Sequence, residues 1–475
     1  MTAKSRRTRF TLAAAALVAV LPACGGESRS AVTTTAPPAT APTTETMPAT
    51  SAPSADAIEV PGDYATIQEA VDAASPGDLV LVAPGTYSEA VTITTENITL
   101  RGLDRNEVVL DGRLELDNGV RVLGVNGVVV ENMTAMNYTR NGFFFTMANG
   151  YRGSYLTAYR NGDYGVYAFD SVNGQFDHIY AAGSPDAGLY IGQCYPCNAV
   201  VSDVISEHNG LGYSGTNAGG NLFIVNSIFR FNRAGIVPNS GTYELCYPQR
   251  ATTIVGNLVY SNNQPDTPAI DVAILAMGNG ILSAGGILNV IERNRVWDHD
   301  KGGISLVPFL EEDPNDSMPA ADAWGLTCAE SRELPRSAPG GSLLWDSMQN
   351  RVIGNVLTDN RAADILLSSV GTDVATLGNC FAGNTFATSA PQAIEGLAPC
   401  DAAGSGDWTA GAYDVAAWLV EATTRPPSVD WKTAPLPELE PQESMPDAAT
   451  APAVPATDMP PTIDLDAIVV PDAPG

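Results

Sequence analysis

Asp163-Tyr-Gly-Val-Tyr167 and Asp186-Ala-Gly-Leu-Tyr190 are two copies of one short pattern, 23 residues apart. A glycine followed by an apolar residue repeats the same interval at Gly142, Gly165 and Gly188. A period of about 20 to 50 residues indicates a solenoid, a propeller or an array. The repeating units are short, rich in Val, Ile, Phe and Tyr, and leave no room for a helix. The stretch from 126 to 236 therefore predicts a parallel β-solenoid, whose coils stack and share one core.

A polar residue before a short apolar strand is a second repeating mark. Because asparagines at equivalent turns of stacked strands can bond to one another, this mark predicts a hydrogen-bonded ladder along the stack. Its members are Asn132, Asp203, Asn226, Asn257, Asn294, Asn355 and Asn384.

The chain is strongly acidic, with a formal net charge of −29 and only three lysines, Lys4, Lys301 and Lys432. Binding to nucleic acid needs basic surface, so the charge argues strongly against this class of partner. A polyanionic glycan is disfavoured unless basic residues are concentrated locally. A general bias of the source toward acidic surfaces explains the charge equally well.

Residues 1–24 have the form of an export signal, with a basic start and an apolar run from Leu12 to Leu21 that is too short to span a bilayer. Leu21-Pro22-Ala23-Cys24 resembles the lipobox of bacterial lipoproteins. The resemblance implies cleavage before Cys24, lipid attachment there, and a position on the outer face of the cell membrane. The alternative is an ordinary signal peptide and a secreted protein. Residues 25–57 are rich in Thr, Pro and Ala, which is typical of a disordered tether.

Thr66-Ile-Gln-Glu69 has the form of a capping box and predicts a short helix that covers the N-terminal end of the solenoid. The run from Ala65 to Tyr87, which contains Ser75-Pro-Gly-Asp78 and Pro84-Gly-Thr-Tyr87, resembles the opening of the pectin-lyase-like superfamily. That resemblance implies an all-β fold, a right-handed single-stranded parallel β-helix over residues 58–400. It is specific for the fold and not for an activity.

The regular period loosens beyond Ile236. Residues 239–251, 264–286 and 308–348 read as loops inserted between coils, and long loops in a compact repeat are usually functional or disordered. Residues 401–425 include a short amphipathic pattern that could cap the C-terminal end. Residues 426–475 are rich in Pro, Ala and Asp, which favours disorder.

Six cysteines follow Cys24, and an even number in an exported chain indicates disulfides. Cys194-Tyr-Pro-Cys197 suits a structural clip, because neither a thioredoxin-like context nor a second pair of metal ligands accompanies it. Cys246 with Cys328 would tie two inserted loops, and Cys380 with Cys400 would staple the last coils. Spacing alone leaves all 15 pairings of six cysteines open.

Steps of 23 residues place Arg140, Asp163 and Asp186 in one column, and the column continues to Arg233. Carboxylates one coil apart, about 5 Å, raise each other's pKa and can form an acid/base pair. That separation is also typical of retaining glycosidases. Arg140 and Arg233 could then bind the carboxylates of a uronic acid chain. The competing interpretation is that both aspartates are turn formers.

Tyrosines crowd two coils, and among them Tyr167 and Tyr190 are candidates for stacking on sugar rings, although Tyr is also common in strands. The acidic run from Glu311 to Asp316 could bind Ca²⁺ through clustered oxygens. It lacks the spacing of a defined calcium loop, so a solvated acidic loop is the alternative, and no other cofactor is expected.

Two functions fit these observations. The first is an exported, lipid-anchored β-helix protein that binds a polysaccharide or serves as a cell-surface scaffold. The second is a carbohydrate-active enzyme, a lyase, hydrolase or epimerase, that uses Asp163 and Asp186. Because one fold hosts many functions, the choice depends on the site.

Overall fold

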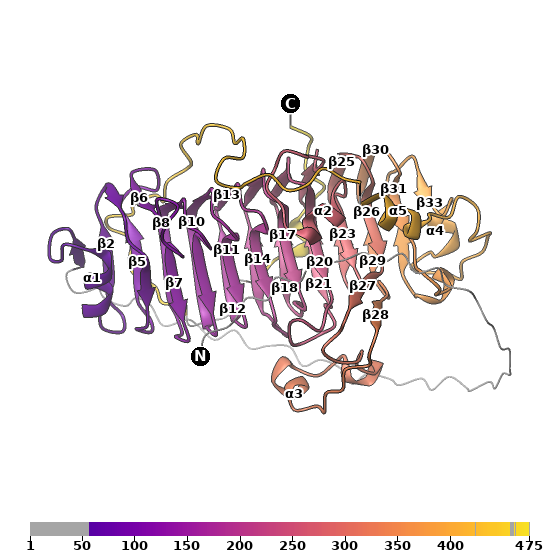
Figure 1. The fold of residues 1–475 in the computed structure, drawn as a ribbon, viewed down its shortest axis with the longest axis horizontal. Helices are drawn as coiled ribbons and strands as arrows, with labels where there is room; N and C mark the ends of the chain where they lie inside the picture. The colour runs from indigo at the N-terminus through magenta and orange to yellow at the C-terminus, as the bar shows by residue number, and fades with distance from the viewer. Residues whose placement is uncertain (1–56, 423, 457–459, 461, 475) are drawn as a thin grey trace. The chain divides into compact units, whose positions relative to one another are not determined.

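Stacked β-strands dominate the computed structural model, which describes residues 57–475 apart from 423, 457–459, 461 and 475 (Figure 1). The expected signal segment, Cys24 and the tether up to residue 56 lie outside the described residues. Within the described part, no helix is long and apolar enough to cross a membrane.

Each coil contributes strands to three parallel ladders, two of which belong to one 20-stranded sheet. The first ladder contains β1 (Ile58–Val60), β2 (Leu79–Val82), β5 (Thr99–Gly102), β8 (Val128–Met136), β10 (Asn149–Tyr159), β12 (Val172–Asp177), β15 (Ala199–Ser202), β18 (Leu222–Val225), β21 (Thr252–Val255), β24 (Val290–Glu292), β29 (Arg351–Ile353) and β32 (Cys380–Ala382). The second contains β3 (Gly85–Tyr87), β6 (Val108–Asp111), the later halves of β8 and β10, β13 (Tyr180–Ala182), β16 (Ile205–Glu207), β19 (Ile228–Arg230), β22 (Leu258–Tyr260), β25 (Arg295–His299) and β30 (Val356–Asn360).

The third ladder is a separate 11-stranded sheet, and it carries the candidate site described below. Its pairing follows the predicted period, since Tyr164 pairs with Ala187 and Val166 with Leu189. The parallel β-solenoid is therefore confirmed. The strands of this sheet are β4 (Val91–Ile93), β7 (Val120–Leu123), β9 (Phe143–Thr146), β11 (Tyr164–Phe169), β14 (Ala187–Gly192), β17 (Leu211–Thr216), β20 (Ala234–Asn239), β23 (Ile281–Ala284), β26 (Gly302–Val307), β31 (Ala363–Leu367) and β33 (Ser389–Ala390).

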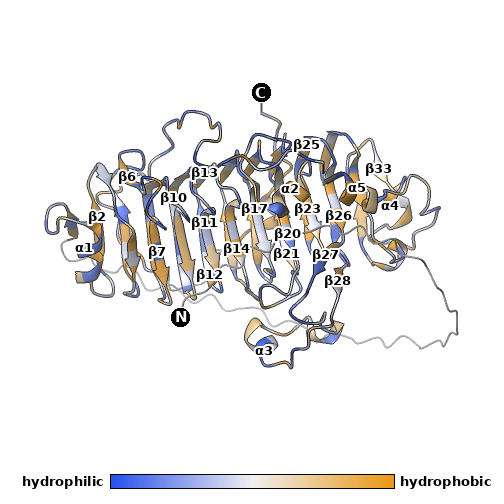
Figure 2. Cartoon of the chain, in the orientation of Figure 1, coloured by the Kyte–Doolittle hydropathy of each residue, from blue (hydrophilic) through white to orange (hydrophobic). Residues whose placement is uncertain are grey.

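Alternation of side chains along each strand sends apolar residues into one continuous core. In β11, Val166 and Ala168 lie in that core, and Tyr167 between them points out of the coil. The strands are mostly apolar and the connecting loops mostly hydrophilic, as Figure 2 shows. The core therefore runs along the whole stack of coils, which leaves the outward residues free to vary.

The predicted asparagine ladder is confirmed at the turn that precedes the second ladder. Asn294 Nδ2 donates to Asn355 Oδ1 at 3.0 Å, and Asn294 Oδ1 accepts from the backbone N–H of Asn257 at 3.0 Å. Asn355 Nδ2 bonds to Asn384 in the same way at 2.9 Å. The other three predicted members lie outside this ladder: Asp203 and Asn226 are exposed, and Asn132 donates to the Gly102 carbonyl at 2.8 Å.

Helix α1 (Ile67–Ala73) covers the N-terminal end, as the capping box predicts. Thr66 Oγ1 accepts from the Glu69 N–H at 3.1 Å, and the Glu89 carboxylate accepts from the N–H groups of Ile67 and Gln68. These bonds satisfy three of the donors that a helix start leaves without partners.

The C-terminal end differs from the expectation. The short helix α4 (Ile394–Leu397) packs its Ile394 into the main core at that end. Helix α5 (Val415–Ala422) lies instead on the outside of the 11-stranded sheet, where Val415 and Trp418 pack with Ala273 of α2 (Asp271–Ala276). The amphipathic face of α5 thus covers a flank, because outward Ala, Val and Leu side chains make that flank apolar.

The inserted loops carry their own structure. Residues 308–348 form the antiparallel hairpin β27 (Phe309–Glu312) and β28 (Ser342–Trp345), with α3 (Cys328–Arg332) between them. Together with α2 and α5, this insertion covers the outer face of the 11-stranded sheet from β14 onward, since Ala187 and Leu211 pack in the same cluster. The outer face of β9 and β11 lies before this cover and stays partly exposed.

The C-terminal segment from residue 426 is not the disordered tail that its composition favours. It lies along the β-helix and is held by arginine side chains that donate to its backbone carbonyls. Buried Arg101 donates to the carbonyls of Ala448, Ala451 and Pro452, and the Arg160 Nη1 donates to those of Trp431, Lys432 and Ala434. A proline-rich segment needs no core of its own when another surface supplies donors for its carbonyls. Further contacts of this kind come from Arg105, Arg233, Arg293 and Arg295.

Loss of one such arginine should release part of the segment. Arg160→Met removes three bonds, each 3.0 Å long, and we expect chymotrypsin to cleave the folded protein after Trp431 at least several times faster. Arg113→Met is the matched control, because Arg113 is exposed and shares the positive φ of Arg160. Equal cleavage rates in the two variants would show that the arginine contacts do not hold the segment.

Candidate functional site

The predicted column of turn residues stands at the start of the 11-stranded sheet. The N–H of Asp163 donates to the Arg140 carbonyl at 2.8 Å, and the N–H of Asp186 donates to the Asp163 carbonyl at 3.1 Å. Gly210 and Arg233 continue it, since the Arg233 N–H reaches the Gly210 carbonyl at 3.2 Å. The repeat therefore places Asp163 and Asp186 on adjacent coils, which are about 4.8 Å apart.

Asp163 is held by Arg140 through an ion pair of 2.8 Å, with both side chains partly exposed. Partial burial raises the pKa of Asp163, and the hydrogen bond and charge of Arg140 oppose that rise. Arg140 is thus occupied by the protein's own carboxylate. A uronate at this position would share the charge of Arg140 with Asp163, although the other donors of the half-exposed guanidinium are not used by that ion pair.

Asp186 is half-buried, and its surroundings favour the protonated form. Burial raises the pKa of Asp186 to about 7, with a smaller contribution from the charge of Asp163, while a hydrogen bond from Tyr164 acts in the opposite direction. A carboxyl group with this pKa can both give and accept a proton near neutral pH.

Three aromatic rings stack along the outward positions of β9, β11 and β14. Tyr167 pairs in register with Phe144 on one side and Tyr190 on the other. The ring centroids are 5.0 and 4.7 Å apart, and the planes differ by 13° and 12°. Tyr164 tilts against the stack, 4.6 Å from Tyr167 and 4.9 Å from Tyr190. Because the rings cover one another's faces, the stack leaves ring edges toward the outer side at Phe144 and Tyr167, which are partly exposed, whereas Tyr190, the other predicted sugar-stacking residue, is buried.

Glu244 approaches this stack from the inserted loop 239–251. The Tyr190 hydroxyl donates to Glu244 Oε1. Burial raises the pKa of Glu244 to about 8; the Tyr190 hydrogen bond lowers it and the charge of Asp186 adds to the rise. We define the phenol–carboxyl cluster as the group of three tyrosines and two acidic residues that meet here: Tyr164, Tyr167, Tyr190, Asp186 and Glu244.

The loop that carries Glu244 is fastened at several points. The Asn217 Nδ2 donates to the Glu244 carbonyl at 3.0 Å, and the Leu245 N–H donates to Gln193 Oε1 at 2.8 Å. Two residues beyond Glu244, the disulfide Cys246–Cys328 ties the loop to α3. The N–H of Cys328 bonds in turn to the carbonyl of Tyr195 at 2.7 Å, within the turn that Cys194–Cys197 closes. The third disulfide is Cys380–Cys400, so all three suggested pairs are confirmed.

Arg233 is placed where it cannot bind a substrate. Its side chain is fully buried, and its guanidinium donates to the carbonyls of Thr267, Pro265, Pro426 and Pro427 at 2.6–3.2 Å. The prediction of a substrate-binding role for Arg233 is therefore wrong. The C-terminal segment and the loop after β22 cover this position, and the repeat period gave no indication of either.

The acidic run considered for Ca²⁺ is split between different partners. Glu311 accepts from the N–H and hydroxyl of Thr242 and from Trp345 Nε1, while Asp316 accepts from the Tyr247 hydroxyl and from backbone N–H groups. Over the described ranges, no group of three or more His, Cys, Asp or Glu side chains converges as metal ligands would. Glu311 and Asp316 thus hold the insertion 308–348 together.

Two residues of the cluster, Glu244 and Tyr164, were not predicted as site residues from the sequence. Glu244 lies in a loop that interrupts the repeat, so counting in steps of 23 cannot reach it. Tyr164 was visible only as one of several crowded tyrosines. The one available signal for Glu244 was the length of the inserted loop that carries it.

Residues 141–308 match a protein-family model described as the right handed beta helix region. The fold is therefore the right-handed parallel β-helix that the resemblance to the pectin-lyase-like superfamily implied. No curated protein matches the chain.

Several solved structures are similar at low sequence identity. One is the A-module of a mannuronan C-5 epimerase from Azotobacter vinelandii, with 14% identity, a TM-score of 0.46, and coverage of 68% of this chain and 91% of that chain. Another is an alginate lyase from Paenibacillus sp., with 14% identity, a TM-score of 0.40, and coverage of 69% and 93%. A surface adhesin of Streptococcus pneumoniae has 12% identity, a TM-score of 0.40, and coverage of 66% and 82%. These likenesses concern the fold, so the function must be argued from the cluster itself.

The raised pKa values predict how stability changes with pH. The folded-state values of about 7 for Asp186 and about 8 for Glu244 lie above the ordinary values of 3.8 and 4.5. The folded state therefore holds protons that the unfolded state releases, and the associated stability is present below about pH 4 and lost as pH rises through 7 and 8. We expect Asp186→Asn and Glu244→Gln each to flatten the fall in the thermal midpoint between pH 5 and 9.

Glu96→Gln, an exposed substitution elsewhere, serves as the control and should retain the wild-type pH dependence. A wild-type midpoint that rises over this range, or cluster variants with the wild-type slope, would contradict the assignment.

Proposed function

We propose that the protein binds a polysaccharide on the outer face of the 11-stranded sheet, at the phenol–carboxyl cluster. The observation that carries the proposal is the gathering of three phenol hydroxyls and two carboxyl groups of raised pKa at a stack of aromatic rings. Ligand sites combine apolar and aromatic lining with a few convergent polar groups. Sugars match this combination, because their hydroxyl groups both donate and accept hydrogen bonds and their ring C–H groups are apolar.

The charge of the site favours a neutral glycan over a polyanionic one. The chain carries a net charge of −29, and the cation beside the cluster, Arg140, is paired with Asp163. A polyanion would meet unfavourable electrostatics at the surface. A neutral chain meets none, since Asp186 and Glu244 carry little charge below their pKa values.

An extracellular position is part of the same proposal. Three disulfides suit an oxidising compartment. The motif that ends at Cys24 supports lipid anchoring at the outer face of the membrane, and residues 25–57 would serve as a tether between anchor and β-helix.

Loss of an outward aromatic should weaken binding. Tyr167→Ala removes the central ring of the stack, and we expect at least a tenfold weaker affinity for the polysaccharide, which corresponds to about 1.4 kcal/mol. Affinity electrophoresis against a panel of neutral and acidic polysaccharides, with and without Ca²⁺, would measure it.

Trp297→Ala is the matched control, because Trp297 stacks on Tyr260 in a different ladder, with centroids 4.2 Å apart. Wild-type affinity in Tyr167→Ala, or a panel in which only polyanions bind, would contradict the proposed site or the proposed ligand class.

A carbohydrate-active enzyme is the second candidate, and the pKa of Asp186 favours it. A carboxyl group that titrates near pH 7 beside a second acid, Glu244, is typical of acid/base catalysis. Asp163, one coil away and bound to Arg140, would remain the charged neighbour. This arrangement suits a lyase, a hydrolase or an epimerase.

Chain length after incubation separates the two candidates. If the protein is an enzyme, size-exclusion chromatography should show shortened chains, ultraviolet absorbance of unsaturated ends should distinguish a lyase from a hydrolase, and NMR should detect epimerisation without shortening. Asp186→Asn should then lower the rate by about 100-fold or more and leave the thermal midpoint near pH 6 similar. Full activity of a folded Asp186→Asn variant would exclude the catalytic role, and unchanged glycans would leave binding alone.

A further inference from the structure

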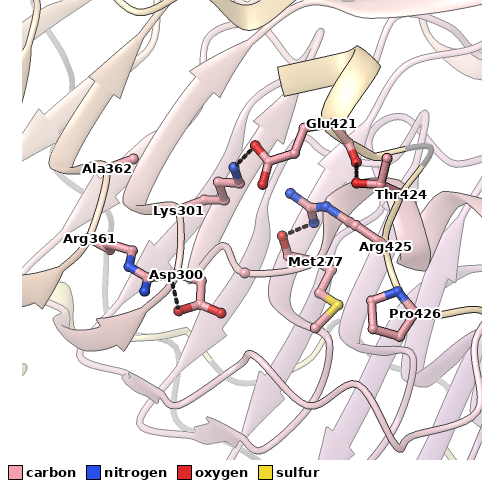
Figure 3. Close-up of a pocket in the computed structure, with 10 residues that line it drawn as sticks. Met277, Asp300, Lys301, Arg361, Ala362, Glu421, Thr424, Arg425 and Pro426 are labelled. Atoms are coloured by element: carbon pink, nitrogen blue, oxygen red, sulfur yellow. Dashed lines mark hydrogen bonds and ion pairs between the residues drawn. The ribbon is translucent and has the colours of Figure 1, made fainter. Parts of the chain in front are cut away.

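A second hollow lies beyond α2, away from the phenol–carboxyl cluster. It has a volume of about 440 Å³ and opens where the end of α2 meets the turn after β25 and the segment after α5. The residue before α2 contacts the cluster side, since the Ile270 N–H bonds to the Pro185 carbonyl, next to Asp186. We call this hollow the Lys301 pocket; its principal side chains are Met277, Asp300, Lys301, Arg361, Glu421 and Arg425 (Figure 3).

Positive charge gathers in the Lys301 pocket, against the trend of the chain. Lys301 is the only lysine between positions 5 and 431, and Arg361 and Arg425 line the same hollow. Two carboxylates, Asp300 and Glu421, face these three cations. The lining therefore keeps a net positive charge in a protein whose net charge is −29.

The ion pairs do not use all of the available donors. Lys301 pairs with Glu421, and Arg361 reaches Asp300 through a single contact of 3.4 Å while its side chain stays 78% exposed. Figure 3 shows these two pairs on opposite sides of the hollow, with Arg425 beside the Lys301 pair.

Arg425 carries a donor that the protein leaves without a partner. Its Nη1 donates to the Met277 carbonyl, whereas its Nη2 is buried and has no hydrogen-bond partner within the described part of the chain. A buried unpaired donor of a charged group is costly, and native proteins usually satisfy such groups with protein, water or a ligand. The free Nη2, Lys301 and the exposed Arg361 fork all border the same space.

We propose that the Lys301 pocket binds a small oxyanion, the carboxylate of a sugar acid or a phosphate group. Planar guanidinium forks and an ammonium group are the donors that proteins use for both. The hollow is large enough to hold one sugar ring with its acidic substituent, and Met277 offers an apolar contact for the ring. The site goes beyond the proposed function, since it selects charge where the phenol–carboxyl cluster selects neutral hydroxyl groups.

Calorimetric titration of the full chain in a non-phosphate buffer tests the proposal. D-glucuronate and inorganic phosphate are the two probes, and D-glucose is the neutral control. We expect saturable binding of at least one anion, no binding of glucose, and a weaker affinity at higher salt. A preference for glucuronate would indicate a sugar acid as the ligand, and a preference for phosphate would indicate a phosphorylated one.

Two variants locate the binding. Arg361→Gln changes an exposed side chain and should weaken the anion about tenfold without changing the thermal midpoint. Arg425→Gln should abolish binding, and Arg113→Gln, at an exposed position elsewhere, should have no effect. Failure of both anions to bind the wild type would overturn the proposal, as would unchanged affinity in Arg361→Gln.

Discussion

The hydrogen bond from one buried asparagine amide to the next is the constraint on which the structure depends. Each asparagine of this ladder fixes the height and rotation of its coil relative to the preceding coil; the four are Asn257, Asn294, Asn355 and Asn384. The amide suits this task because it both donates and accepts, so each link is satisfied on both sides without charge. A slip of one residue would leave buried amides unpaired and would turn apolar side chains outward. The ladder resumes after the insertions 264–286 and 308–348, since Asn257 bonds to Asn294 and Asn294 to Asn355 across them.

The same register determines where side chains can cooperate. Tyr167 stacks on Phe144 and Tyr190 because the three occupy one outward position on successive strands. Asp163 and Asp186 come together in the same way at the turn before those strands. The repeat by itself places only equivalent positions of successive coils next to one another, so neighbouring side chains tend to be of the same type. An insertion brings in a residue such as Glu244, and the disulfide Cys246–Cys328 holds that insertion in place. The candidate site thus combines residues that the repeat places on successive strands with a residue that an inserted loop contributes.

This division explains what the sequence could predict. The fold and the column of Arg140, Asp163 and Asp186 follow from the repeat period and from turn chemistry, and the three disulfide pairs were suggested by the sequence although spacing alone left all 15 pairings open. The burial of Arg233 and the position of Glu244 do not, because both depend on where long insertions return to the β-helix. The C-terminal segment escaped prediction for another reason. Its composition shows that it cannot build a core, but composition says nothing about a surface elsewhere in the chain that offers donors for its carbonyls.

Those donors also bear on the charge of the protein. Three arginines donate hydrogen bonds from their guanidinium groups to backbone carbonyls, and each bonds to at least three carbonyls: Arg101, Arg160 and Arg233. A lysine could not replace them, because a fork of five donors spans several carbonyls whereas an ammonium group presents a single point. Many of the basic residues are thereby withdrawn from the surface, which leaves the exterior more acidic than composition alone implies. Against that exterior, a pocket that keeps Lys301, Arg361 and an unpaired Arg425 donor together is a feature that structural pairing does not explain.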